Sequence, residues 1–282
     1  MTHSYFDFQG NTWYCISIYY TGKDNYQLMP AISSFCSESM PGHYLLFLSD
    51  DSGDHINLAF SFPEPLDKGS AERKIAGYFS DILRRYPSRP PEETAFGNVF
   101  WMNYPNNCMV WNRFNLPEYI LFNQYLLEFA DSNSLLLTCL IDEEAEGPED
   151  YLSLAVFLLI SLSKSETFSG NEFYKTIADL FGENDPFDLR NVSVLDAYLN
   201  YSDETFDPIF KIWITKAGMV LSELGLSQGI ISLLNIISQQ LGLGYSNKLI
   251  VSPVIAWSKA RKKLGQKMLS PANTKFQLRN SS

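Results

Sequence analysis

The stretch from His43 to Phe60 predicts a β-hairpin, and the rest of the chain has to cover the faces of that hairpin. Tyr44–Leu48 is a short apolar run, which is typical of a strand buried on both faces. Asp50–Asp54 is rich in residues that favour turns. From His55 onward every second residue is apolar, so His55 and Asn57 should point to one face while the apolar residues between them point to the other. We therefore expect polar groups at one end and on one face of a sheet.

Strand signals are concentrated in the first half of the chain and helix signals in the second. Two further strands are predicted, at 11–20 and 96–104. The spacing of apolar residues predicts helices at 27–38, 70–86, 118–131, 133–142, 149–164, 170–181, 205–224, 228–241 and 252–268. This is an α+β pattern, with a strand-rich half (1–145) that forms a sheet and a helical half (146–270) packed on it. We expect a single domain over 1–282 with a mobile tail at 271–282, and the acidic stretch Asp142–Asp150 is the best candidate for an internal boundary.

Composition narrows the class of protein. With 282 residues, of which 45% are hydrophobic, the chain can bury a large core. The aromatic content of 15% fits either an aromatic-lined cleft or simply a thick core. None of the four cysteines forms a Cys-x-x-Cys pair, which favours a reduced, cytoplasmic setting without a zinc site. The N-terminus has no signal-peptide pattern, and the longest apolar run, Leu152–Leu162, is too short to span a bilayer, so no membrane segment is expected.

Charge is unevenly distributed along the chain. The net charge of −11 argues against a nucleic-acid partner, because a protein that binds phosphates is generally basic. After Glu223, however, there is no acidic residue, and a basic stretch runs from Lys259 to Lys267. This stretch is predicted to be an exposed helix, and a solvated charged face is its simplest interpretation. The alternative is a docking site for an acidic peptide, formed by Lys259, Arg261, Lys262, Lys263 and Lys267.

The common catalytic signatures are missing from the sequence. We find no P-loop, no dinucleotide-binding glycine motif, no nucleophile elbow and no zinc-protease motif, so no metal and no cofactor is implied. The chain has only three histidines, His3, His43 and His55. On residue type alone, His55 is either a strand-edge histidine bonded to Asp54 or a nearby carbonyl, or a catalytic group.

The predicted helix 228–241 carries neutral polar residues on an otherwise apolar surface. Ser232, Asn235 and Gln239 fall on one line along it, with Ser238 beside them. Buried amides need partners, because an unpaired one costs about 1–3 kcal/mol. These side chains therefore either bond to neighbouring loops or line a cleft.

Arg113 is a single arginine among aromatic and amide residues. Its planar guanidinium can clamp a carbonyl or carboxylate group. It can equally stack on Trp111 or Phe114 and have no further role.

Five segments together resemble a known family. They are Trp13–Tyr20, the hairpin segments Leu45–Asp51 and His55–Ala59, Phe129–Ser132, and Ser232–Gly242. These segments resemble the C-terminal domain of class I lantibiotic dehydratases, and the resemblance covers nearly the whole chain. That domain eliminates glutamate from glutamylated Ser or Thr, and its stand-alone relatives are thiopeptide pyridine synthases.

The departures from the family pattern are informative. The family hairpin carries three arginines, and here Ser49, Asn57 and Ala59 stand at their positions. The family helix carries His-Met-x-x-Asn-Arg, and the matching positions here are Asn235, Gln239 and Gln240. The family's Tyr-x-x-Glu motif with its arginine matches only loosely, with Tyr104, Asn107 at the glutamate position and Arg113 as a shifted counterpart.

These departures favour one activity of the family over the other. Glutamate elimination needs a base for the α-proton and cations for the departing carboxylate, and the matching positions here supply neither. A pyridine synthase has no glutamate to expel and needs a neutral, hydrogen-bonding, aromatic cleft. The hypothesis is therefore a pyridine synthase that joins two dehydroalanines of a ribosomally made, azole-bearing peptide by a formal [4+2] cycloaddition, with loss of water and leader peptide. The alternatives are a non-catalytic precursor-binding partner of a dehydratase and a split glutamate eliminase.

The resemblance also implies a candidate site and partners. The expected proton-transfer residues are His55, Tyr19, Tyr20 and Tyr104. The expected substrate-binding residues are Trp13, Ser49, Asn57, Arg113, Asn235, Ser238 and Gln239. Leaders in this family tend to be acidic, which makes the basic Lys259–Lys267 stretch the candidate leader dock. The partners would be the dehydrated precursor peptide and other biosynthetic enzymes, with the protein itself a monomer or homodimer.

Overall fold

A computed structural model describes most of the chain. The described residues are 5–50, 54–63, 67–89, 104–111, 114, 116–143, 148–164, 170–182, 207–244 and 247–268. Every structural statement below refers to these residues.

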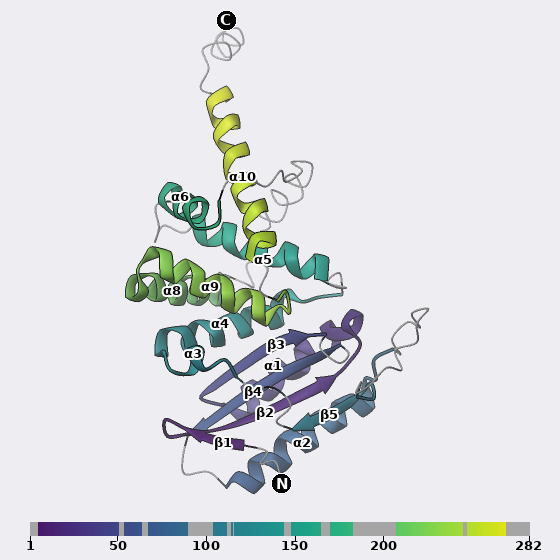
Figure 1. The fold of residues 1–282 in the computed structure, drawn as a ribbon. Helices are drawn as coiled ribbons and strands as arrows, with labels where there is room; N and C mark the ends of the chain where they lie inside the picture. Colours follow the sequence, from purple (N-terminus) through teal and green to yellow (C-terminus); the bar gives the residue numbers. More distant parts are fainter. Residues whose placement is uncertain are drawn as a thin grey trace, which may run out of the picture. The chain divides into compact units, whose positions relative to one another are not determined.

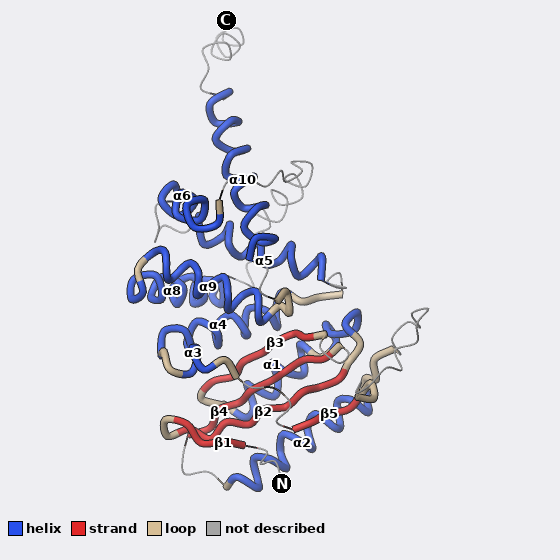
Figure 2. The backbone as a smooth tube through the Cα atoms, viewed as in Figure 1, coloured by secondary structure: helices blue, strands red, loops and turns tan. Residues whose placement is uncertain are grey.

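The first half of the chain forms one antiparallel sheet (Figures 1 and 2). Its strands are β1 (Tyr5–Phe8), β2 (Asn11–Tyr19), β3 (His43–Ser49), β4 (His55–Pro63) and β5 (Cys108–Trp111). The strand order is β1-β2-β4-β3, and β5 pairs with β2 beyond the end of β1. β3 and β4 form the predicted hairpin, with Ser49 opposite His55 and Phe47 opposite Asn57. The α+β class is confirmed, because the second half of the described chain is helical.

The helices follow the predicted pattern closely. They are η1 (Gly22–Gln27), α1 (Met29–Ser39), α2 (Lys68–Arg85), α3 (Glu118–Leu121), α4 (Gln124–Leu140), α5 (Pro148–Lys164), α6 (Gly170–Phe181), α8 (Asp207–Leu224), α9 (Leu226–Gln240) and α10 (Asn247–Met268). Pro30 lies in the first turn of α1, where its missing N–H costs no hydrogen bond.

One sequence-based division between helices was wrong. Helices predicted at 118–131 and 133–142 are instead a short α3 and a continuous α4, because Asn123 caps α4 by accepting from the N–H groups of Tyr125 and Leu126. The strand predicted at 96–104 falls mostly outside the described residues, and Tyr104 belongs to no strand. The chain pairs with β2 only from Cys108 onward.

One face of the sheet is apolar and is covered by α1 and α2 (Figure 1). Cross-strand pairing aligns Ile16 with Leu58 and Tyr14 with Phe60 on this face. The Phe60 ring contacts Phe35 of α1 and Phe79 of α2, at centroid distances of 5.0 and 6.0 Å. All of these side chains are fully buried, so this face holds a core of the protein.

The helix α4 runs along the edge strand β3 and accepts a hydrogen bond from the backbone of that strand. The Ser134 hydroxyl accepts a hydrogen bond from the Leu46 N–H at 3.0 Å. Behind it, Gln240 of α9 donates to Ser134 at 2.7 Å, and Asn133 donates to Gln240 at 2.7 Å. The Trp213 ring of α8 donates to Asn133 at 2.7 Å. This buried network fixes three helices on the sheet edge, and a covered edge does not pair with other chains.

The chain divides into two compact units. The first comprises Met1–Leu152 and Asp203–Tyr245, and therefore joins α8 and α9 to the sheet. The second comprises Ser153–Ser202 and Ser246–Ser282, where α6 and α10 pack through Tyr174 and Trp257, with ring centroids 6.0 Å apart. The single domain with a strand-rich 1–145 and a helical 146–270 stays a prediction, and the tail at 271–282 lies outside the described residues.

Candidate functional site

The face of the sheet opposite α1 and α2 carries polar and aromatic side chains at one end. The strand register places Ser49, His55 and Tyr19 in one row across three neighbouring strands. The next row contains Asn57 and Ser17, and the Ser17 hydroxyl donates to the Asn57 carbonyl oxygen at 2.5 Å. His55 and Asn57 are only 5% and 6% exposed. The hairpin pattern in the sequence thus correctly predicted a polar end on one face.

Aromatic stacking extends this row beyond the strands. The His55 ring stacks on Tyr19 at a centroid distance of 4.8 Å. Tyr104, which precedes β5, packs on Tyr19 at 4.7 Å. Three of the four predicted proton-transfer residues therefore form one contiguous cluster, which we call the Tyr104–Tyr19–His55 stack.

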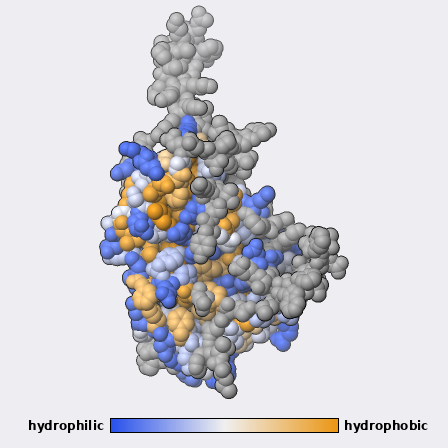
Figure 3. All heavy atoms as spheres, viewed as in Figure 1, coloured by the Kyte–Doolittle hydropathy of each residue, from blue (hydrophilic) through white to orange (hydrophobic). Residues whose placement is uncertain are grey.

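A segment around α3 crosses the same face of the sheet. Phe114 contacts Phe47 of β3, with ring centroids 5.7 Å apart. Phe122 packs edge-on against Phe8 of β1 at 5.0 Å and is still 66% exposed. Figure 3 shows hydrophobic and hydrophilic residues interspersed on the visible face. The polar face is therefore covered over its middle by residues that precede α4.

The helix α9 approaches the site from the side of β3. Gln239 accepts a hydrogen bond from the Tyr119 hydroxyl of α3 at 2.8 Å, so it joins the segment that covers the polar face. Asn235 lies one turn earlier and is half-buried. Ser238 donates to the Gly244 carbonyl at 2.5 Å, which is the loop-bonding alternative considered from the sequence. A Cβ at Gly242, whose φ is +68°, would lie 2.8 Å from the Leu48 carbonyl oxygen. Glycine at this position lets the loop after α9 reach the end of β3, next to Ser49.

Two predicted site residues lie away from the stack. Tyr20 follows Tyr19 and therefore points the other way; its hydroxyl donates to the Tyr86 carbonyl at 2.7 Å, and burial raises its pKa to about 12. Trp13 shares the face of His55 but lies six residues from Tyr19 along β2, which corresponds to about 20 Å. It stacks instead on His43, at the opposite end.

Other predicted residues are placed only in part. Arg113 lies outside the described residues. The basic stretch belongs to α10, and Lys259 is exposed there. The side chains of the other four members, Arg261, Lys262, Lys263 and Lys267, lie outside the described part of the structure.

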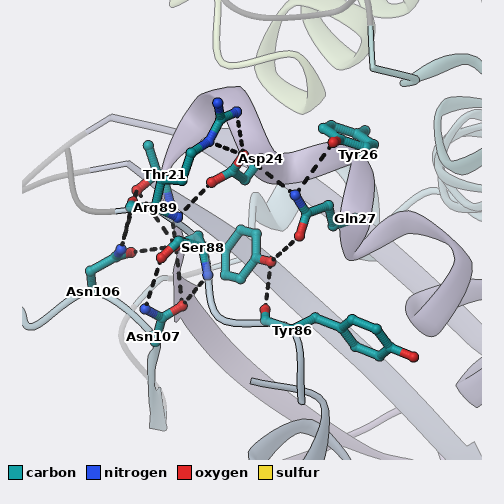
Figure 4. A network of polar contacts seen from close by, with 10 residues as sticks. Thr21, Asp24, Tyr26, Gln27, Tyr86, Ser88, Arg89, Asn106 and Asn107 are labelled. Atoms are coloured by element: carbon teal, nitrogen blue, oxygen red, sulfur yellow. Dashed lines mark hydrogen bonds and ion pairs between the residues drawn. The ribbon is translucent and has the colours of Figure 1, made fainter. Parts of the chain in front are cut away.

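A second polar cluster, which no local sequence pattern predicted, lies at the corner after β2 (Figure 4). Asp24 of η1 is fully buried and forms an ion pair with Arg89, whose side chain is 70% exposed. Burial by itself would raise the pKa of Asp24, but the hydrogen bonds and the charge of Arg89 outweigh burial and lower it. Asp24 and Arg89 are 65 residues apart in the sequence, so no local pattern connects them.

The chemical capacity of the site is neutral hydrogen bonding and proton transfer. Histidine and tyrosine can accept or donate a proton, and the Asn57 amide can orient a carbonyl group. No group of three or more His, Cys, Asp or Glu side chains suited to a metal occurs among the described residues. Within the same residues, no helix has the length and apolar character needed to cross a bilayer.

Comparisons with known proteins agree with this architecture. No protein-family model matches the sequence, and no curated protein matches it either. Among the chains of solved structures that match is "Pyridine synthase, TbtD, from thiomuracin biosynthesis". The likeness covers 88% of this chain and 98% of that one, with a TM-score of 0.56 and 13% sequence identity. The chain therefore has the fold of a thiopeptide pyridine synthase.

Proposed function

We propose that this protein acts in thiopeptide biosynthesis as a pyridine synthase. Its substrate would be a dehydrated, azole-bearing precursor peptide that still carries its leader. Two dehydroalanines of one peptide would combine in a formal [4+2] cycloaddition, which forms the central six-membered ring and closes the macrocycle.

The observation that best supports this proposal is the Tyr104–Tyr19–His55 stack beside Ser49 and Asn57. Apart from His55, the side chains in these two rows are uncharged polar or aromatic groups. Cations for a departing carboxylate are missing at the matching positions, where Ser49, Asn57 and Ala59 stand. The row therefore suits a reaction whose reacting atoms carry little net charge.

The reaction balances without an oxidant. One dehydroalanine reacts as a 2-azadiene in its imidic-acid tautomer, the other as the alkene, and two bonds between their carbon atoms form. Loss of water and then of the leader peptide as an amide makes the ring aromatic. Each step moves a proton, which His55 or Tyr19 would donate or accept. Holding the two distant residues together removes an entropic barrier of up to about 7–11 kcal/mol.

The direct test is to incubate the purified protein with a dehydrated, thiazole-bearing precursor and follow its mass. We expect a product lighter by the leader amide plus one water. His55→Gln, Tyr19→Phe and Tyr104→Phe should each lower the rate by about 10²-fold or more, as loss of a general acid or base does. His43→Gln is the matched control, because His43 lies on the same face but at the other end.

The same assay distinguishes the alternatives. An unchanged mass with retained leader binding would support a non-catalytic precursor-binding partner and overturn the proposal. Conversion of a glutamylated peptide to dehydroalanine would instead identify a glutamate eliminase. A scaffold should also tolerate Asn235→Leu and Gln239→Leu, whereas a synthase that uses these amides should lose turnover while it still binds leader.

We further propose that the basic stretch Lys259–Lys267 of α10 binds the acidic leader. The 59 residues after Glu223 contain no acidic side chain, so the attraction of this stretch for an acidic peptide is not opposed locally. Reversing Lys259, Arg261 and Lys262 to Glu should weaken leader binding at least tenfold and reduce its salt dependence. The control is the double charge reversal of Arg73 and Lys74 in α2 to Glu. If the double variant weakens leader binding as much as the triple variant does, the assignment is contradicted.

A further inference from the structure

The Asp24–Arg89 ion pair joins two separate parts of the chain (Figure 4). Asp24 belongs to η1, directly after β2, and Arg89 follows α2. A fully buried carboxylate is costly unless it is paired and hydrogen-bonded. Asp24 accepts three hydrogen bonds from Arg89, from the backbone N–H at 2.6 Å, from Nε at 3.0 Å and from Nη2 at 2.6 Å. Both the backbone and the side chain of residue 89 are thereby held in place.

Hydrogen bonds connect residue 89 to the segment that precedes β5. Asn106 donates to the Arg89 carbonyl at 3.1 Å and to the Thr21 hydroxyl at 3.2 Å. Thr21 also donates to the Arg89 carbonyl. Ser88 donates from its N–H to the Asn107 side-chain oxygen at 2.7 Å. The segments that contain Ser88 and Asn106 are therefore tied together at the corner after β2.

Asn107 connects this corner to the stack. Its N–H donates to the Tyr19 carbonyl at 2.7 Å. Its φ is +62°, a left-handed conformation that asparagine tolerates better than most residues. Tyr104 lies three residues before Asn107 and packs on the Tyr19 ring. Any shift of this turn therefore displaces Tyr104 relative to Tyr19 and His55.

We propose that the Asp24–Arg89 pair is a positioning device for the candidate site, which holds Tyr104 against Tyr19 and so sets the ring geometry around His55. The proposal rests on the proposed function for its catalytic meaning, but the positioning itself does not depend on any activity. Asp24 and Arg89 are positioning residues, because they act on Tyr19 and Tyr104 through the hydrogen bonds of Ser88, Asn106 and Asn107.

Histidine NMR tests the positioning without an activity assay. The chain has three histidines, so selective labelling gives three ring signals, and His55→Gln assigns that of His55. In Asp24→Asn, we expect the His55 signal to move, because the ring currents of Tyr19 and Tyr104 change. The His43 signal should stay, since His43 lies at the other end of the sheet. Asp81→Asn is the matched control: it breaks ion pairs with Arg84 and Arg85 on the surface of α2 and should leave both signals unchanged.

A second variant covers the case in which Asp24→Asn does not fold. The Arg89 side chain is largely exposed, so Arg89→Ala should fold and should shift the His55 signal in the same direction. Unchanged His55 signals in folded variants would overturn the proposal and leave the ion pair as a structural brace. If the enzyme assay succeeds, both variants should lower kcat by about tenfold or more with little change in KM. Shifted signals in a protein without synthase activity would instead refute the proposed function and retain the positioning.

Discussion

The two faces of the one sheet differ in what their side chains do. On the face covered by α1 and α2, Ile16, Leu58 and Phe60 are fully buried among apolar partners. On the opposite face of the same strands, Ser17 and Asn57 form a hydrogen bond with each other, and His55 stacks on Tyr19. Both faces are almost inaccessible to water, so burial alone does not distinguish them.

The difference shows where this sheet depends on apolar burial and where it does not. Burying apolar side chains drives folding, whereas buried polar side chains contribute little net stability even when they are fully bonded. The polar row lies at the end of a sheet that already has a large apolar core. A function therefore explains its polar side chains better than a contribution to stability does. Substitutions made on one face at a time test this difference between the two faces.

Phe60→Ala should have the largest effect. It removes a ring that contacts Phe35 and Phe79 in the centre of the apolar face, and such a deletion costs about 3–5 kcal/mol of unfolding free energy. Chemical denaturation of the two proteins measures the loss. Phe6→Ala, at a ring that is 36% exposed on β1, is the control and should cost far less.

Acid should act on the polar end through Asp24. Because Arg89 lowers the pKa of Asp24 in the folded protein, its contribution to stability is complete above the unfolded pKa of about 4 and is lost as the pH falls through the lower folded value. Asp24→Asn should therefore destabilise by about 1.5–3 kcal/mol at pH 7, as expected for hydrogen bonds to a charged group. The gap to wild type should narrow below pH 4, as followed by denaturation at several pH values. A gap that is constant down to the lowest pH would contradict this.

Asn57→Leu should change stability by only about 1 kcal/mol. The Ser17 hydroxyl loses its acceptor, but the new side chain buries additional apolar surface, and the two effects offset each other. Denaturation of the variant measures the balance, and the precursor assay should show lost turnover in the same protein. A cost as large as that of Phe60→Ala would mean that both faces are core, and the contrast between them would fail.

Cys15 provides the smallest and most local test. It lies on the polar face but beyond the polar rows, and burial raises the pKa of its thiol to about 12. In the native state at pH 8 it should therefore not react with a thiol reagent, and it should react once the protein is unfolded. Fast reaction of Cys15, identified by peptide mass mapping, would mean that the polar face is open along its whole length.

Local pattern was enough to predict the hairpin and most helices. Alternation from His55 to Phe60 predicted which side chains share a face, and helix spacing placed α5, α6 and α8 within about two residues. The pattern failed at Asn123, where a capping side chain decides that α4 begins anew and then continues without a break. It also gave no reason to prefer Tyr19 over Tyr20, because consecutive strand residues point to opposite faces and only the pairing shows which face is which.

The α+β class, the polar end of the hairpin and the family resemblance could all be predicted from the amino-acid sequence, because they depend on periodicity and residue type within short stretches. Three other features became visible in the folded chain alone: Tyr104 completes the stack, Gln239 bonds to Tyr119, and Asp24 pairs with Arg89. Each of these contacts joins residues between 65 and 120 positions apart. Such contacts form because the whole chain closes around one core, and no local periodicity encodes them.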